Sequence, residues 1–187
     1  MDRRTLMRSA LLLVAAGPVL ADEKAAPVTD PAPAENDIEK YPHCVVCSMD
    51  RRKFHFARHL VHYGDGHAEG TCSINCAAEC MLKERRRGFK AVHAPDYGAE
   101  GEPKPLIEAS AAIYLIGSDL RGVMTPVSKY AFADADAARR AQAVAGGRIG
   151  TFAEALASAL GDYASSLTRR YDTDRERQRR KPEGSTG

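Results

Sequence analysis

The spacing of apolar residues predicts the same order of elements twice between residues 41 and 167. The first half contains, in order, a strand at 55–63, a turn at 64–66, a returning strand at 67–72, a helix at 74–87 and a short strand at 89–94. The two longer strands flank Gly64-Asp65-Gly66, which is a strong hairpin signal. The helix has Ser73 as its N-cap, arginines in its last turn and Gly88 as its stop.

The second half repeats this order with a different sequence. Its predicted elements are a strand at 111–118, a connection at 119–126, a returning strand at 127–133, a helix at 134–145, a short strand at 148–150 and a final helix at 151–167. An aspartate caps the helix at its start, and Gly146-Gly147 ends it. Because either half alone is too small to bury a sound core, we expect an α+β fold of two packed ββαβ-type repeats with a C-terminal helix.

The segments outside these repeats have a different composition. Residues 22–40 are rich in proline, alanine and acidic side chains, and residues 168–187 are charged and poor in apolar ones. We expect a flexible linker and a charged tail there, with ordered structure beginning near Tyr41. The predicted segments are an export signal at 1–21, the linker at 22–40, a first unit at 41–104, a second unit with the final helix at 105–167, and the tail at 168–187.

The N-terminal residues have the layout of a cleaved export signal. Three arginines precede an apolar run over residues 10–20, and Val19-Leu20-Ala21 offers small residues to a signal peptidase. The run is too short to cross the hydrocarbon core of a bilayer. Arg3-Arg4 fits a twin-arginine signal and also an ordinary secretion signal, and both remain open. The sequence therefore predicts a periplasmic or exported protein that is soluble once the signal is removed.

Charge and residue types exclude two classes of function. Removal of residues 1–21 takes away three arginines and one aspartate, so the mature chain is formally neutral. Nucleic-acid binding requires a basic face, and a chain with no net charge gives no indication of one. The sequence shows no set of nucleophile, base and orienting residue, so we expect neither an enzyme nor a small-molecule substrate.

The candidate chemistry is concentrated in sulfur-containing residues. The chain has five cysteines, which cannot all pair with one another as those of an exported protein normally do. Cys44, Cys47 and Met49 form a Cys-x-x-Cys-x-Met element whose thiols and thioether are soft donors. Such donors select copper(I) over hard ions, whereas zinc accepts thiolates but uses methionine poorly. A redox pair is disfavoured because a proline-rich segment, and no strand, precedes this element.

A second group of cysteines lies in TCSINCAAEC, residues 71–80. Cys72 and Cys76 flank a predicted helix N-terminus, where thiolates are favoured, so they are lower-ranked metal ligands. They could also pair with each other or with Cys44, or complete a four-cysteine zinc site with Cys44 and Cys47. Cys80 is expected in the core. Met124, in the turn GVMTP, is either a further soft ligand or a turn residue without a role.

Four stretches in order resemble the NosL family of exported copper(I)-binding accessory proteins of nitrous-oxide reductase maturation. They are CVVCSMD, GDGHAEGTCSINCAA, AAIYLIGSDLRGVMTPVSKYAFAD and AGGRIGTFAEAL. The resemblance implies two related ββαβ-type units and a copper(I) site formed by Cys47, Met49 and Met124. It also implies periplasmic or membrane-bound copper donors and acceptors as partners.

The chain departs from that family in three respects. It has no anchoring cysteine near residue 21, it has more thiols than the implied site needs, and Ser48 stands where a glycine is common. We therefore add Cys44 to the expected ligands and keep two alternatives open. These are a structural zinc module of the four-cysteine type and a periplasmic thiol–disulfide protein. The client enzyme, disulfide pairing, number of ions and oligomeric state stay undetermined at this stage.

Overall fold

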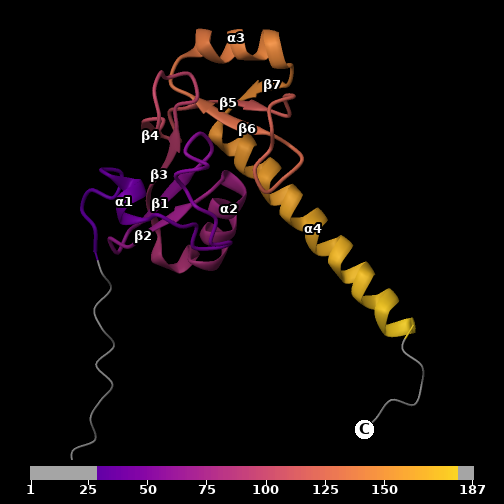
Figure 1. Cartoon of the computed structure of the whole chain (residues 1–187). Coiled ribbons are helices and arrows are strands. Elements are labelled where there is room, and N and C mark those ends of the chain that lie inside the picture. The colour runs from indigo at the N-terminus through magenta and orange to yellow at the C-terminus, as the bar shows by residue number, and fades with distance from the viewer. Residues whose placement is uncertain (1–28, 181–187) are drawn as a thin grey trace, which may run out of the picture.

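The computed structural model of the chain describes residues 29–180, which form two antiparallel sheets and their helices (Figure 1). The predicted export signal lies outside the described residues. No helix within residues 29–180 is both long enough and apolar enough to cross a membrane.

The first sheet has the strand order β2-β1-β3-β4. Its strands are β1 (His59–Tyr63), β2 (Ala68–Thr71), β3 (Phe89–Pro95) and β4 (Leu106–Glu108). Helix α2 (Ile74–Lys83) follows β2, and the short 3-10 helix η1 (Arg85–Arg87) continues it. The side chain of Ser73 accepts a hydrogen bond from the backbone N–H of Cys76, which confirms Ser73 as the N-cap.

The second sheet has the order β6-β5-β7, which matches β2-β1-β3 of the first sheet. Its strands are β5 (Ile113–Ile116), β6 (Lys129–Phe132) and β7 (Arg148–Gly150). Helix α3 (Ala135–Ala145) begins after Asp134, whose carboxylate accepts from the N–H of Ala137 at 2.7 Å. Both halves therefore have the order ββαβ and the same strand arrangement, so the predicted repeat is confirmed.

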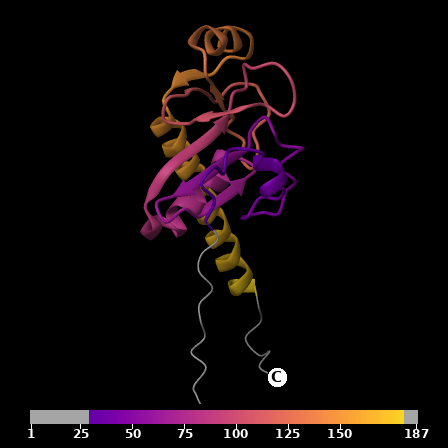
Figure 2. The same ribbon diagram turned by 90° about the vertical axis from the view of Figure 1, so that its left-hand side faces the viewer.

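The two units share one hydrophobic core. Val61 of β1, Ile74 of α2, Tyr114 of β5 and Ala155 of α4 (Phe152–Arg180) are all buried in it. Figures 1 and 2 show α4 starting beside the second sheet, running past α2 of the first unit and extending beyond the other labelled helices and strands. Burial of a common core explains why neither unit has to be stable alone.

The segment predicted as a linker is ordered at its end. Helix α1 (Asp37–Lys40) lies within it, and its Asp37 is buried. The Asp37 carboxylate lies 2.8 Å from the guanidinium nitrogens of both Arg51 and Arg58. A composition rich in proline and acids predicted flexibility, but two buried guanidinium groups require a carboxylate partner. The expectation that ordered structure begins near Tyr41 is therefore wrong.

Several boundaries also differ from the predicted ones. The strand predicted at 55–63 begins only at His59, and the helix predicted at 74–87 ends at Lys83 before η1. Strand β4 was not predicted, since its three residues carry no clear alternation. Helix α4 continues to Arg180 instead of ending near residue 167, although its last part is exposed. Its exposed turns are rich in charged residues, and Arg177 lies 3.9 Å from Asp174, one turn earlier.

Candidate metal centre

A tight loop holds the Cys-x-x-Cys-x-Met element. The N–H of Cys44 donates to the carbonyl of Met49 at 2.9 Å, and the N–H of Ser48 donates to the carbonyl of Cys44 at 2.8 Å. Ser48 has a φ of 61°, in the left-handed region that favours glycine. The loop therefore holds both thiols of the element in a fixed turn.

The buried guanidinium of Arg51 fastens this loop to β2 and α1. Its Nε donates to the carbonyl of Thr71 at 3.1 Å, and its Nη1 donates to the carbonyl of Tyr41 at 2.6 Å. A Cβ atom added at Gly70 would lie only 2.7 Å from Nη1 of Arg51. The glycine is therefore needed for the close approach of the arginine, and the loop is held rigidly.

The other two thiols come from the start of α2. Cys72 directly follows β2, and Cys76 lies in the first turn of the helix, where it donates its N–H to the Ser73 cap. Both are buried. The N-terminus of α2 therefore lies beside the sulfur cluster, and the positive end of its dipole favours negative charge there.

The loop and the helix start bring four thiols together. One ligand atom from each of Cys44, Cys47, Cys72 and Cys76 lies within 4.8 Å of all the others. The Sγ atom of Cys47 lies 3.4 Å from that of Cys72 and 3.9 Å from that of Cys76. The Sγ atoms of Cys72 and Cys76 are 3.7 Å apart. Four thiolates around a tetrahedral zinc ion are separated by about 3.8 Å, so these spacings suit a metal ion.

None of the cysteines is in a disulfide. Hydrogen bonds from the thiols of Cys72 and Cys76 hold the pKa of the Cys44 thiol far below its usual range. The same contacts with Cys44 raise the pKa of Cys72 and of Cys76. The cluster therefore favours one thiolate that accepts hydrogen bonds from its neighbours. A cation that replaces those protons would be bound with proton release.

An apolar shell surrounds most of the cluster. Met49, Phe54 and Val123 pack against Cys44, Cys72 and Cys76. Val123 comes from the second unit, between β5 and β6. The ion site is thus shielded from water by both halves of the chain.

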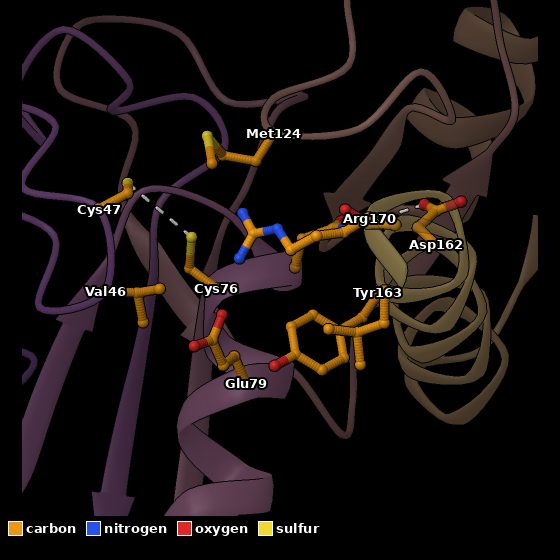
Figure 3. A pocket seen from close by; sticks show the side chains of 11 residues that line it. Val46, Cys47, Cys76, Glu79, Met124, Asp162, Tyr163 and Arg170 are labelled. Carbon is orange, nitrogen blue, oxygen red and sulfur yellow. Dashed lines mark hydrogen bonds between the residues drawn. The ribbon is translucent and has the colours of Figure 1, made fainter. Parts of the chain in front are cut away.

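One side of the cluster opens into a cavity of about 390 Å³. Cys47, Cys76 and Met124 line it, together with the α4 residues Asp162, Tyr163, Ser166, Leu167 and Arg170. The Met124 side chain points to the side on which the sulfurs of Cys47 and Cys76 lie, and the Arg170 guanidinium points toward Cys76 (Figure 3). Met124 is 53% exposed, so it borders the opening instead of filling the core.

The predicted ligands take different places around this centre. Cys44, Cys47, Cys72 and Cys76 converge, so the two lower-ranked thiols are as central as the first two. Met49 lies in the surrounding shell, and Met124 lines the same cavity as Cys47 and Cys76. Cys80 is buried apart from them in the main core, as expected. The sequence did not predict that α4 forms a wall of this cavity, because the spacing of apolar residues in that segment predicts only an exposed helix end.

These features define an α+β protein of two ββαβ units with a sulfur-lined candidate metal site between a loop and a helix. The NosL family model matches residues 35–160, and the chain belongs to the NosL family. Its fold is similar to the crystal structure of the copper chaperone NosL from Shewanella denitrificans, with a TM-score of 0.50 and 22% identity. That match covers 60% of this chain and 87% of the other. Comparison with curated proteins finds no similar sequence.

Proposed function

We propose that the protein is an exported copper(I) metallochaperone that delivers copper for maturation of a periplasmic cuproenzyme such as nitrous-oxide reductase. Family membership and the copper chaperone with a similar fold support this proposal. The observation that carries it is the convergence of four thiols that open, at Cys47, onto a cavity bordered by Met124. Copper is the cargo, and no catalytic turnover is required.

The donor set favours copper(I) as that cargo. In this proposal Cys47, Met49, Met124 and Cys44 are the candidate ligands, and Cys72 and Cys76 are alternative thiolates for the same ion, since one copper(I) ion takes only a few of these donors at a time. Thiolates and thioethers are soft donors that select copper(I). The positive end of α2 and the Arg170 guanidinium favour the negative charge that several thiolates retain around a monovalent ion.

The burial of the ligands supports transfer instead of permanent storage. Cys44, Cys72 and Cys76 are buried, whereas Cys47 is partly exposed and Met124 is more exposed. An incoming sulfur donor from a partner can therefore reach the ion from the cavity before the buried thiols release it. Transfer by such ligand exchange needs no free copper ion. The expected partners are periplasmic or membrane-bound copper donors and acceptors.

A structural zinc site is the second candidate, because the thiol separations of 3.4–3.9 Å suit tetrahedral zinc. Four thiols would complete such a site, but the partly exposed Cys47 and the methionine that lines the same cavity favour a soft ion that can be transferred. The thiol–disulfide alternative has less support. Cys44 and Cys47 lie in a loop and not at the helix N-terminus of a βαβ unit, where redox Cys-x-x-Cys pairs are found, and both belong to a four-thiol cluster.

Metal analysis of the mature chain, purified anaerobically from the periplasm, separates these candidates. We expect copper(I) to be retained and its affinity, measured by competition with a chromophoric copper(I) chelator, to fall roughly tenfold in Met124→Leu. Zinc affinity should stay unchanged in that variant, because methionine is a poor zinc ligand. Met81→Leu, a change in the partly buried core of α2, is the matched control. Bound zinc together with no methionine effect would support the structural zinc module.

A further inference from the structure

A single carboxylate oxygen joins three segments at the edge of the candidate metal centre. Oδ2 of Asp162, on α4, accepts a hydrogen bond from Nζ of Lys129 at 2.6 Å and from Nδ2 of Asn75 at 3.5 Å. It also accepts from the Thr125 hydroxyl. Three donors from three parts of the chain therefore converge on one atom.

Two of these donors are sequence neighbours of the sulfur residues. Asn75 precedes Cys76 in the first turn of α2, and Thr125 follows Met124 in the connection between β5 and β6. Asp162, Cys76 and Met124 line the same cavity. The carboxylate thus links the helix that carries a buried thiol to the loop that carries the exposed thioether.

The loop that carries Met124 needs such support. Met124 has a φ of 64°, in the left-handed region that non-glycine residues rarely adopt. Its neighbour Val123 packs against the cysteines, and the Thr125 Oγ1 also accepts from the N–H of Val127 at 3.1 Å. A conformation of this kind persists only where its surroundings fix it.

The Asp162 carboxylate is ionised when it makes these contacts. Burial opposes the charge, but hydrogen bonds from Lys129 and Thr125 hold the pKa of Asp162 below its usual value. The Lys129 side chain is only 1% exposed, so the Asp162 carboxylate is also the charge partner of a buried ammonium group. Asp162 lies just beyond the segment that matches the family model.

We propose that Asp162 is a positioning residue that holds Met124 beside Cys47 and Cys76 so that its thioether can bind copper(I). This inference rests on the proposed copper site and adds a determinant of its selectivity. Because Asp162 acts through a thioether, it raises the affinity for copper(I) without changing that for zinc(II).

A double-mutant cycle on the mature full-length chain tests this role. Asp162→Asn should lower copper(I) affinity roughly fivefold in the wild-type background and cause no further loss in a Met124→Leu background. Zinc(II) affinity should be unchanged in each variant. Asp172→Asn, on the exposed part of the same helix, is the matched control and should bind copper(I) normally.

A second variant covers the case in which Asp162→Asn does not fold, because that change leaves Lys129 without its partner. Thr125→Val removes one contact to the carboxylate and preserves the ion pair, and it should show the same dependence on Met124. Equal losses in the Met124→Leu and wild-type backgrounds, or an equal loss of zinc(II) affinity, would overturn the inference. The inference would also be overturned if Asp162→Asn and Thr125→Val both bound copper(I) normally while Met124→Leu bound it weakly. Normal binding by Met124→Leu itself would overturn the proposed methionine ligand as well.

Discussion

Ser48 and Met124 are non-glycine residues with left-handed backbone conformations, and both lie beside the cysteine cluster. Their φ angles are 61° and 64°. Backbone strain of this kind concentrates at functional sites, where the surrounding contacts maintain it. One residue comes from each unit, so the candidate site is constrained from both sides. The two positions differ in role, since Met124 carries a sulfur and Ser48 only closes a turn.

We expect Ser48→Gly to stabilise the protein, because glycine adopts the left-handed conformation without a steric penalty. The gain in the free energy of unfolding should be about 0.5–1 kcal/mol after the larger chain entropy of glycine is deducted. Urea unfolding of the metal-free protein measures it. Ser110→Gly, a change in an exposed turn without a positive φ, should give no gain. Equal effects of the two changes would contradict this explanation.

The elements around the first sheet are fastened by buried polar groups. Arg51 is fully buried, and its N–H groups contact carbonyls or the carboxylate in α1, β1 and β2. Arg58 donates to the same Asp37 carboxylate from Nε at 2.8 Å and from Nη2 at 2.9 Å. Buried charges are tolerated only when they are paired and hydrogen-bonded. This network therefore fixes the loop of Cys44 and Cys47 against the sheet.

Gly70→Ala should break this arrangement, since the new Cβ would lie 2.7 Å from both Arg51 Nη1 and Tyr41 Cβ. Arg51 cannot move without losing hydrogen bonds, so we expect a loss of roughly 2–3 kcal/mol in the free energy of unfolding. Gly161→Ala is the matched control, because its Cβ meets nothing within 4 Å on helix α4 and should raise stability by about 1 kcal/mol. Thermal and urea unfolding of both variants distinguish the two outcomes. A harmless Gly70→Ala would show that the close approach is not required.

At the level of the whole molecule, the two units are joined through buried side chains as well as through α4. His59 of β1 is fully buried, and its Nε2 lies 3.2 Å from the hydroxyl of Tyr114 on β5. Its Nδ1 lies 2.9 Å from the carbonyl of Ala57, to which the neutral ring donates. Burial lowers the pKa of His59 to about 4, with smaller contributions from Arg51 and Arg58.

This histidine makes the stability of the fold depend on pH. The unfolded chain takes up a proton near pH 6.5, whereas the folded chain does so only near its pKa of about 4. The contribution of His59 is therefore complete above pH 6.5 and is lost as pH falls to 4, by on the order of 3 kcal/mol. Urea unfolding of metal-free protein between these pH values should show a flatter dependence in His59→Asn. An unchanged slope in His59→Asn would contradict this assignment.

Local signals in the sequence predicted most elements and their order. Turn glycines, the caps Ser73 and Asp134, and apolar spacing within each element depend on residues a few positions apart, so a linear reading detects them. The same reading found the sulfur residues and the resemblance to the NosL family. It could not detect that Asp37 belongs to the core or that α4 forms a wall of the cavity. Those features depend on partners elsewhere in the chain, such as Arg58 and Cys76.

The sequence alone established the repeated ββαβ order and the soft-donor character of the chain, because both follow from residue types and short-range spacing. Folding decided which donors meet. Cys72 and Cys76 reach Cys44 and Cys47 only because β2 packs beside the loop and α2 begins there. Met124 borders the same opening because the second unit shares a core with the first. Contacts between residues far apart in the chain create the candidate site, and local propensity cannot predict such contacts.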